Sequence, residues 1–272
     1  MTDVTETTGR LGTTAWTLRG GGPGAPVLAL HGVTDSGECW WPALGDVPAH
    51  RRVLTVDARG HGGSDLTDEP FTIAALAADA AAVVRAVLGE PVVVLGHSMG
   101  GLVAEELTLT EPGLVTALVL EDPAWLATHD ARNDRGAPVW LPEVIASVQG
   151  RTLDELVAQG RRENPTWPAD EVEAGARARQ ALSPDLARGT HRWADRDWVE
   201  AMAGVRVPVT LITGDTALGA LVDEAQAARA AELVGDLTHV AIPGVGHCIR
   251  REDRAAFRAA LDAALARADA AR

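Results

Sequence analysis

Two residue types are missing from this chain of 272 residues: it contains no tyrosine and no lysine. Short-chain dehydrogenases pair a tyrosine with a lysine to move a proton, so that chemistry is excluded. Epoxide hydrolases in which a tyrosine assists ring opening are excluded for the same reason. The lack of lysine together with abundant alanine suggests a GC-rich bacterial genome, which concerns ancestry and not mechanism.

Cysteine and long apolar runs are also scarce. The two cysteines, Cys39 and Cys248, are too few for a disulfide framework, and we expect both to stay reduced and to serve packing. No apolar run reaches the roughly 20 residues that a membrane-spanning helix needs. Residues 1–24 are polar and rich in threonine and glycine, without the apolar centre of a secretory signal. We therefore expect a cytoplasmic protein.

Basic residues are outnumbered, because 24 Lys+Arg stand against 38 Asp+Glu and give a formal net charge of −14 at pH 7. Such a chain repels nucleic acid and anionic membranes, so we expect neither as a partner. Hydrophobic residues make up 46% of the chain, which is enough for one large core with or without an inserted segment. We expect a monomer or homodimer whose partner is a small-molecule substrate.

Short apolar runs alternate with longer segments of helical period, and this alternation predicts the fold class. The expected strands are 26–30, 52–56, 92–95, 117–120, 209–213 and 238–242, and the expected helices are 73–88, 101–110, 223–234 and 252–270. This order is typical of an α/β protein with a mainly parallel sheet and helices on both faces. Ligands of such proteins bind outside the carboxyl ends of the strands.

The alternation breaks between residues 123 and 203. This stretch has prolines and helix-like pieces at 153–162 and 171–182 but no convincing strand, so we expect an inserted helical lid on a core made of 1–122 and 204–272. Five of the eight tryptophans lie in it, at positions 125, 140, 167, 193 and 198. Tryptophan offers a large apolar wall with one polar group, and we take Trp125 as a candidate substrate-binding residue. Alternatively, these tryptophans only attach the lid to the core.

A serine between two glycines follows the apolar run 91–95, in the sequence Gly96-His97-Ser98-Met99-Gly100. This pattern is typical of a nucleophile elbow, a tight turn from strand to helix that only very small flanking residues allow. Ser98 would stand at the N-terminus of a helix, with the N–H of Met99 directed at an oxyanion. Taken alone, the pattern also fits an ordinary glycine-rich turn with an idle serine.

Three further motifs occur in a fixed order around this one. His31-Gly32-Val33-Thr34-Asp35-Ser36 follows an expected strand, the run from Asp57 to Ser64 follows the next strand, and Gly246-His247 follows the last. With these four motifs the chain resembles a serine hydrolase of the α/β-hydrolase fold, from about residue 27 to the C-terminal helix. The resemblance implies that His247 is the general base, that the N–H groups of Val33 and Met99 form the oxyanion hole, and that His61 is structural.

The acidic partner of His247 departs from the commonest pattern of that family. Most members carry the acid in a Gly-x-x-Asp arrangement after the lid, but here alanine occupies the expected position and Asp215 stands two positions early. Haloalkane dehalogenases and lactonases similar to zearalenone hydrolases carry the acid after the strand that follows the elbow helix. Asp122 lies at that place, 24 positions after Ser98. We expect Asp122 to be the acid and keep Asp215 as the alternative, with Asp223 and Glu121 behind them.

The expected reaction is acyl transfer through Ser98, with hydrolysis of a carboxylic ester or lactone of an apolar small molecule. No metal or organic cofactor is implied, because the chain has no ligand-spaced histidine and cysteine cluster and no dinucleotide or phosphate-loop motif. The same triad could cleave carbon–carbon, carbamate, amide or thioester bonds, since fold and triad do not determine the leaving group. A receptor that binds a ligand without catalysis is the other alternative.

Overall fold

The computed structural model describes residues 4–126, 138–188, 191–193 and 196–271, and an eight-stranded sheet runs through them. The strand order is β1-β2-β4-β3-β6-β7-β9-β10. The strands are β1 (Glu6–Leu11), β2 (Thr14–Arg19), β3 (Gly24–Leu30), β4 (Arg51–Val56), β6 (Val92–His97), β7 (Val115–Glu121), β9 (Val209–Thr213) and β10 (Leu237–Ala241). From β4 to β10 every pair of neighbours is parallel, whereas β1 and β2 are antiparallel to their neighbours.

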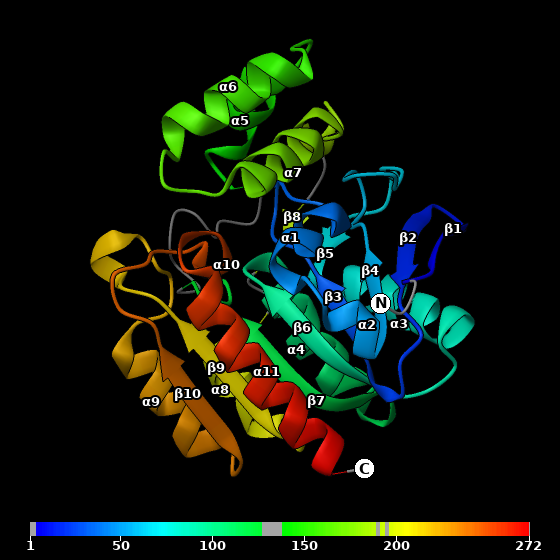
Figure 1. Ribbon diagram of the computed structural model, residues 1–272, viewed down its shortest axis with the longest axis vertical. Helices are drawn as coiled ribbons and strands as arrows, with labels where there is room; N and C mark the ends of the chain where they lie inside the picture. Colours follow the sequence, from blue (N-terminus) through cyan, green and yellow to red (C-terminus); the bar gives the residue numbers. More distant parts are fainter. Residues whose placement is uncertain (1–3, 127–137, 189–190, 194–195, 272) are drawn as a thin grey trace.

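Helices cover both faces of this sheet (Figure 1). One face packs against α3 (Ile73–Val87), α4 (Met99–Thr110), α8 (Trp198–Ala201) and α9 (Glu224–Leu233). The other packs against α1 (Trp41–Leu44), α2 (Val47–His50) and α11 (Arg254–Ala270). The central strands β3, β6 and β7 are apolar on both sides because both faces are covered. The α/β fold class expected from the alternation is confirmed.

The N-terminal hairpin was not expected from the sequence. Residues 4–24 show little apolar alternation, yet β1 and β2 pair over six residues and β2 extends the sheet at β4. β1 is largely exposed, so its polar side chains cost little and its pairing depends on the backbone. β2 is half-buried, and its Trp16 and Leu18 pack against the core. A second, two-stranded sheet joins β5 (Phe71–Thr72) to β8 (His191–Arg192). It corrects the expectation that 123–203 contains no strand.

The rest of the segment 123–203 is helical where the structure describes it. It contains α5 (Leu141–Val148), α6 (Leu153–Glu163) and α7 (Ala169–Gln180), which gather at one end of the molecule beyond the sheet (Figure 1). Residues 127–137, 189–190 and 194–195 of the expected lid lie outside the described residues. The division into a core and a lid at residues 123 and 203 stays a prediction.

Candidate active site

A cavity of about 340 Å³ lies at the carboxyl ends of the parallel strands and is lined by three of the predicted site residues, Val33, Ser98 and His247. Its described lining comprises Val33, Thr34, Asp35, His97, Ser98, Ala124, Leu126, Pro138, Trp140, Val144, Trp167, Arg179, Trp193, Leu221, His247, Cys248 and Arg251. A wider and more polar depression of about 660 Å³ lies over β2 and α7. It contains none of the predicted site residues, so the smaller cavity is the candidate active site.

Ser98 occupies the turn between β6 and α4 in a backbone conformation that few residues adopt. Its φ is 55° and its ψ is −118°, and it precedes the first residue of α4. The flanking glycines are required by space: a Cβ on Gly96 would lie 2.3 Å from the carbonyl oxygen of Gly100, and a Cβ on Gly100 would lie 2.1 Å from that of Leu30. The Gly-x-Ser-x-Gly pattern therefore follows from packing of the turn against β3, and the strained serine faces the cavity.

Asp122 and His247 are joined by a hydrogen bond. The Nδ1 atom of His247 lies 2.6 Å from Oδ2 of Asp122, whose side chain is fully buried. Backbone N–H groups hold the same carboxylate: Leu221 donates to Oδ2 at 2.8 Å and Val222 donates to Oδ1 at 3.1 Å. Asp122 immediately follows β7 and has a positive φ of 39°. Its carboxylate is thus held in place from both sides before it reaches the imidazole.

Asp215, the alternative acid, is placed elsewhere. It is exposed at the end of β9, and its Oδ2 accepts a hydrogen bond from the N–H of Gly244 at 2.7 Å. Asp223 caps α9 through a hydrogen bond from the N–H of Gln226. Of these candidates, the structure brings Asp122 to His247 and uses the other two to order local backbone.

Two backbone N–H groups stand beside Ser98 without a partner. Val33 lines the cavity in the loop after β3, next to Thr34, which has a positive φ of 71°. Met99 is the first residue of α4, where the N–H groups have no intrahelical acceptor. Within the described residues neither N–H donates to a protein acceptor. Both N–H groups are therefore available to an acceptor that enters the cavity, as the prediction of an oxyanion hole requires.

Three hydrogen bonds, made by Glu252 and His97, hold the loop that carries His247. The carboxylate of Glu252 accepts from the N–H groups of Gly246 at 2.7 Å and Cys248 at 3.2 Å, and His97 Nε2 lies 3.1 Å from the carbonyl oxygen of His247. Burial, with Arg250 nearby, holds the pKa of His97 well below its usual value, so this ring is neutral and donates through Nε2–H. The sequence analysis did not predict that Glu252 holds this loop, although the position of Glu252 just after His247 in the sequence offered a signal.

Ser98 and His247 share the cavity but are not hydrogen-bonded to one another in the described part of the chain. Catalytic hydrogen bonds of this kind are often long in a site without substrate and tighten when substrate binds. His247 is also partly exposed, at 28% of its side chain, whereas its partner acid is fully buried. The imidazole of His247 therefore contacts the buried carboxylate of Asp122 and also lines the open cavity.

The profile of the alpha/beta hydrolase family matches residues 27–260. The chain belongs to this family. The match covers all four motifs, the parallel part of the sheet and the segment between residues 123 and 203.

Three relatives of the chain carry the names of different hydrolases. It is 27% identical over 242 residues to the 2-(acetamidomethylene)succinate hydrolase of Mesorhizobium japonicum, which covers 85% of this chain and 84% of the relative. The N-formylmaleamic acid deformylase Nfo of Pseudomonas putida S16 superposes with a TM-score of 0.77 at 23% identity, over 94% of this chain and 100% of that one. The esterase RhEst1 of Rhodococcus sp. ECU1013 superposes with a TM-score of 0.74 at 23% identity, over 97% and 98%. The two structural matches establish the shared fold.

Trp125 does not lie where it was expected. Only 2% of it is exposed, and its indole N–H donates to Glu105 of α4, so it packs under the cavity and not in its wall. The tryptophans that line the cavity are Trp140, Trp167 and Trp193. Because the indole N–H of Trp125 donates to a buried carboxylate of α4, the ring does not line the cavity. Sequence alone assigned tryptophan walls to this segment but could not say which of the rings reach the substrate space.

His61 and Asp57, near the site, make contacts that order the surrounding loops. Burial lowers the pKa of His61 to about 3, so it is neutral, and its Nε2 accepts from the N–H of Thr34 at 3.4 Å. Asp57 accepts from the N–H groups of Gly37 and Gly63, which ties the loop after β4 to the loop after β3. The contacts of His61 agree with the structural role that the resemblance implied for it.

Neither cysteine is a nucleophile of the usual reactive kind. Burial raises the pKa of Cys39 to about 12 and that of Cys248 to about 11, so both are thiols at neutral pH. Cys248 lies next to His247 and lines the cavity, whereas Cys39 packs against α7. Among the described residues there is no group of three or more histidine, cysteine, aspartate and glutamate side chains arranged to hold a metal ion. No described helix is both long and apolar enough to cross a bilayer.

Proposed function

We propose that the protein hydrolyses a carboxylic ester or lactone of an apolar small molecule through an acyl-enzyme on Ser98. The observation that carries the proposal is the 2.6 Å hydrogen bond between His247 and the buried Asp122, at a cavity that also holds the strained Ser98. The three residues supply a nucleophile, a base and a carboxylate that orients the base. The unpartnered N–H groups of Val33 and Met99 complete the set.

The reaction follows from the placement of these groups. His247 takes the proton from Ser98 Oγ as that oxygen attacks the substrate carbonyl, and the carbonyl oxygen becomes an oxyanion held by the N–H groups of Val33 and Met99. His247 then gives the proton to the leaving alcohol, so the ester bond breaks and the acyl group stays on Ser98. Water repeats the sequence with the same base and releases the acid. Asp122 keeps the proton of the imidazole on Nδ1, which leaves Nε2 free to act.

The walls of the cavity favour an apolar acyl group or alcohol. The rings of Trp140, Trp167 and Trp193 line it together with aliphatic side chains such as Val144 and Leu221. Its volume of about 340 Å³ is at the lower end of what small-molecule sites occupy. A compact ester or lactone fits such a space better than a long acyl chain.

One residue of the cavity supports a second candidate. Arg179, in the last turn of α7, lines the cavity, and its Nη1 lies 3.3 Å from Glu163. Arg251 also lines the cavity but is paired with the buried Asp35. The guanidinium of Arg179, among the tryptophan rings, suits a substrate that carries a carboxylate. The relative from Mesorhizobium japonicum is named for a substituted succinate that contains an acetamido group. The second candidate is therefore hydrolysis of an amide bond in a small carboxylic acid.

The test compares the wild type with Ser98→Ala, using a fluorophosphonate probe and p-nitrophenyl esters of acetate, butyrate and octanoate. Ser183→Ala is the matched control, because that hydroxyl only accepts from the N–H of Asp185 outside the cavity. We expect the wild type and the control to label and to turn over acetate and butyrate, and Ser98→Ala to do neither. A wild type that neither labels nor turns over any ester would refute the proposal and favour a ligand-binding protein.

The two candidates separate on a second panel, which contains simple lactones and N-acetyl amides with and without a carboxylate. If an anionic amide is the substrate, Arg179→Gln should raise KM for it about ten-fold and leave KM for a neutral ester unchanged. Arg188→Gln is the control, because that side chain is 80% exposed and pairs with Asp185. Equal effects of Arg179→Gln on charged and neutral substrates would eliminate the second candidate.

A further inference from the structure

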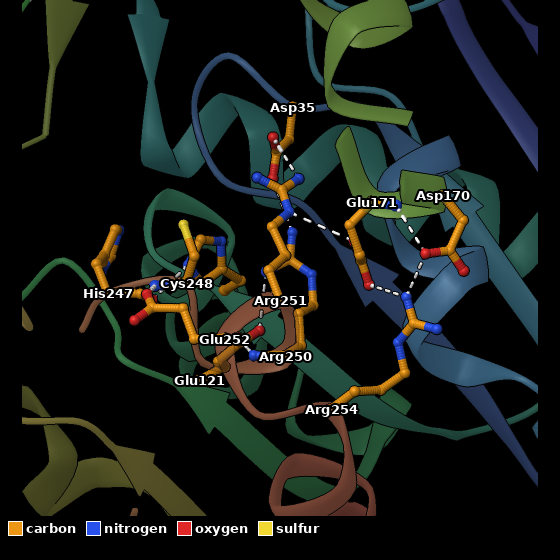
Figure 2. A network of polar contacts seen from close by, with 11 residues as sticks. Asp35, Glu121, Asp170, Glu171, His247, Cys248, Arg250, Arg251, Glu252 and Arg254 are labelled. Carbon is orange, nitrogen blue, oxygen red and sulfur yellow. Dashed lines mark hydrogen bonds and ion pairs between the residues drawn. The ribbon is translucent and has the colours of Figure 1, made fainter. Parts of the chain in front are cut away.

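A buried arginine stands three residues after His247. Arg250 belongs to the short helix α10 (Ile249–Glu252), and its side chain has no exposed surface. Its Nη1 donates to Glu121 at 3.0 Å and its Nη2 donates to Asp35 at 2.8 Å, while its backbone N–H donates to the other oxygen of Glu121 at 2.8 Å. Figure 2 shows this residue between the two carboxylates, with His247 on the same loop.

Each partner of Arg250 lies beside a residue of the proposed site. Glu121 ends β7 and directly precedes Asp122. Asp35 is two residues after Val33 in the loop that follows β3. The guanidinium therefore connects the segment that carries Asp122 and the segment that carries Val33 to the segment that carries His247. Its partners Glu121 and Asp35 are 129 and 215 residues from Arg250 along the chain.

The position of the guanidinium is determined by more than two ion pairs. Its Cζ lies 4.5 Å from the centroid of the Trp40 ring, so an aromatic face covers it. Burial alone would raise the pKa of Asp35, but Arg251 and Arg250 hold that pKa well below its usual range and keep the carboxylate ionised. Burial raises the pKa of Glu121, and the hydrogen bonds from Arg250 oppose that rise. Among the described residues, Glu121 forms its ion pair with Arg250, and Asp35 forms its ion pairs with Arg250 and Arg251.

We propose that Arg250 is a positioning residue for the reaction: it holds the loop of Val33, the end of β7 before Asp122 and the loop of His247 at the separation that catalysis by Ser98 needs. This proposal rests on the function proposed above. Arg250 does not line the cavity, and it acts through the side chains of Glu121 and Asp35, which it holds by hydrogen bonds. Displacements of about 1 Å in such an arrangement lower rates about 100-fold, so the effect should appear in kcat.

The test replaces Arg250 with lysine, which keeps one positive charge but cannot bond two carboxylates in the plane of a guanidinium. The matched control is Arg51→Lys. Arg51 is also buried, with 8% exposed, and pairs through both Nη atoms with Asp269 and with the carbonyl oxygen of Ala25, on segments that do not carry site residues. Active sites are counted by titration with the fluorophosphonate, and kcat and KM for p-nitrophenyl acetate are expressed per titrated site.

We expect Arg250→Lys to lower kcat per titrated site about 10- to 100-fold with KM within about three-fold, and Arg51→Lys to leave kcat per site within about two-fold. A merely structural arginine would reduce the number of titratable sites in both variants and leave kcat per site unchanged. Equal kcat per site in the two variants would overturn the proposal.

If Arg250→Lys yields no folded protein, Glu121→Gln decides. Glutamine has the size of glutamate and can still accept from the backbone N–H of Arg250, but it offers no charge to the guanidinium. We expect about a ten-fold loss of kcat per titrated site with KM unchanged, and an unchanged kcat would overturn the proposal. If the proposed function itself is wrong, the result differs from a failure of the Arg250 proposal, because the wild type would then neither titrate with the fluorophosphonate nor turn over the ester.

Discussion

Replacing Asp122 with asparagine tests the least certain member of the proposed triad. The carboxylate has three donors around its two oxygens: His247 Nδ1 at 2.6 Å and the N–H of Leu221 at 2.8 Å on Oδ2, and the N–H of Val222 at 3.1 Å on Oδ1. An amide has only one oxygen. In either orientation, Asp122→Asn must therefore set its NH2 group against at least one of these donors.

Both orientations of the amide impair the base. If the amide oxygen faces His247, the tautomer survives, but the NH2 group opposes the N–H of Val222 and the negative charge that stabilises an imidazolium is lost. If the NH2 group faces His247, it donates to Nδ1 and drives the ring proton to Nε2, which then cannot accept the proton of Ser98. Changes of this type in serine triads lower kcat about 10⁴-fold, or about 5.5 kcal/mol in activation free energy. The buried donor left unpaired costs a further 1–3 kcal/mol of stability, on the order of one lost hydrogen bond.

The assay is kcat for p-nitrophenyl acetate per titrated site, with thermal unfolding measured in parallel. Asp215→Asn is the control, because the amide oxygen can still accept from the N–H of Gly244. We expect a loss of three to four orders of magnitude, on the order of a triad substitution, for Asp122→Asn and less than about three-fold for the control. A larger loss from Asp215→Asn, or less than ten-fold from Asp122→Asn, would refute the assignment.

Three further predictions use other parts of the molecule. Gly100→Ala should prevent folding, because the new Cβ would lie 2.1 Å from a backbone oxygen of β3, whereas Gly113→Ala meets nothing within 4 Å and should melt like wild type by circular dichroism. Because burial lowers the pKa of His61 to about 3 from an ordinary 6.5, the unfolded chain binds the proton first and stability is lost as the pH falls below about 6.5. The loss is about 2 kcal/mol at pH 5, and urea unfolding at pH 7 and 5 should show a smaller pH dependence for His61→Gln, an equal one counting against the reasoning. Trp140→Ala should raise KM for an apolar ester about ten-fold, whereas Trp125→Phe should lower the melting temperature and leave KM unchanged, the reverse result contradicting the cavity lining described here.

The central sheet could be predicted because its strands are buried on both faces. A strand such as β6 is a short continuous apolar run between a turn and a glycine, and its length and flanking residues favour a buried strand over a helix. The outer strands β1 and β2 escaped prediction for the opposite reason. The side chains of β1 are largely exposed and those of β2 are only half-buried, so the amino-acid pattern carries little information about a pairing that backbone hydrogen bonds make. An apolar sequence pattern reflects burial, and the strands at this edge of the sheet are less buried than the central ones.

The elbow and the histidine loop could be located because each is a local constraint. Gly96 is needed by the turn itself and Gly100 by the packing of the turn against β3, and both lie within five residues of chain. The acid is different, since its spacing to Ser98 favoured Asp122 but left Asp215 open. The choice depends on where β7 ends relative to a loop 125 residues further on. Only the packed sheet determines that distance.

The buried ion pairs around the site are the part that no local pattern could predict. In the sequence, Arg250, Arg251 and Glu252 resemble the polar start of a surface helix, and Glu121 resembles a weaker candidate for the acid. In the fold, both arginines are buried because Glu121 and Asp35 meet them there. A charge can be buried only where opposite charges are brought to it, so its environment is decided by strands and loops over 100 residues away. Charges at the carboxyl end of such a sheet are therefore candidates for a role in holding the site, even where the sequence makes them look like surface residues.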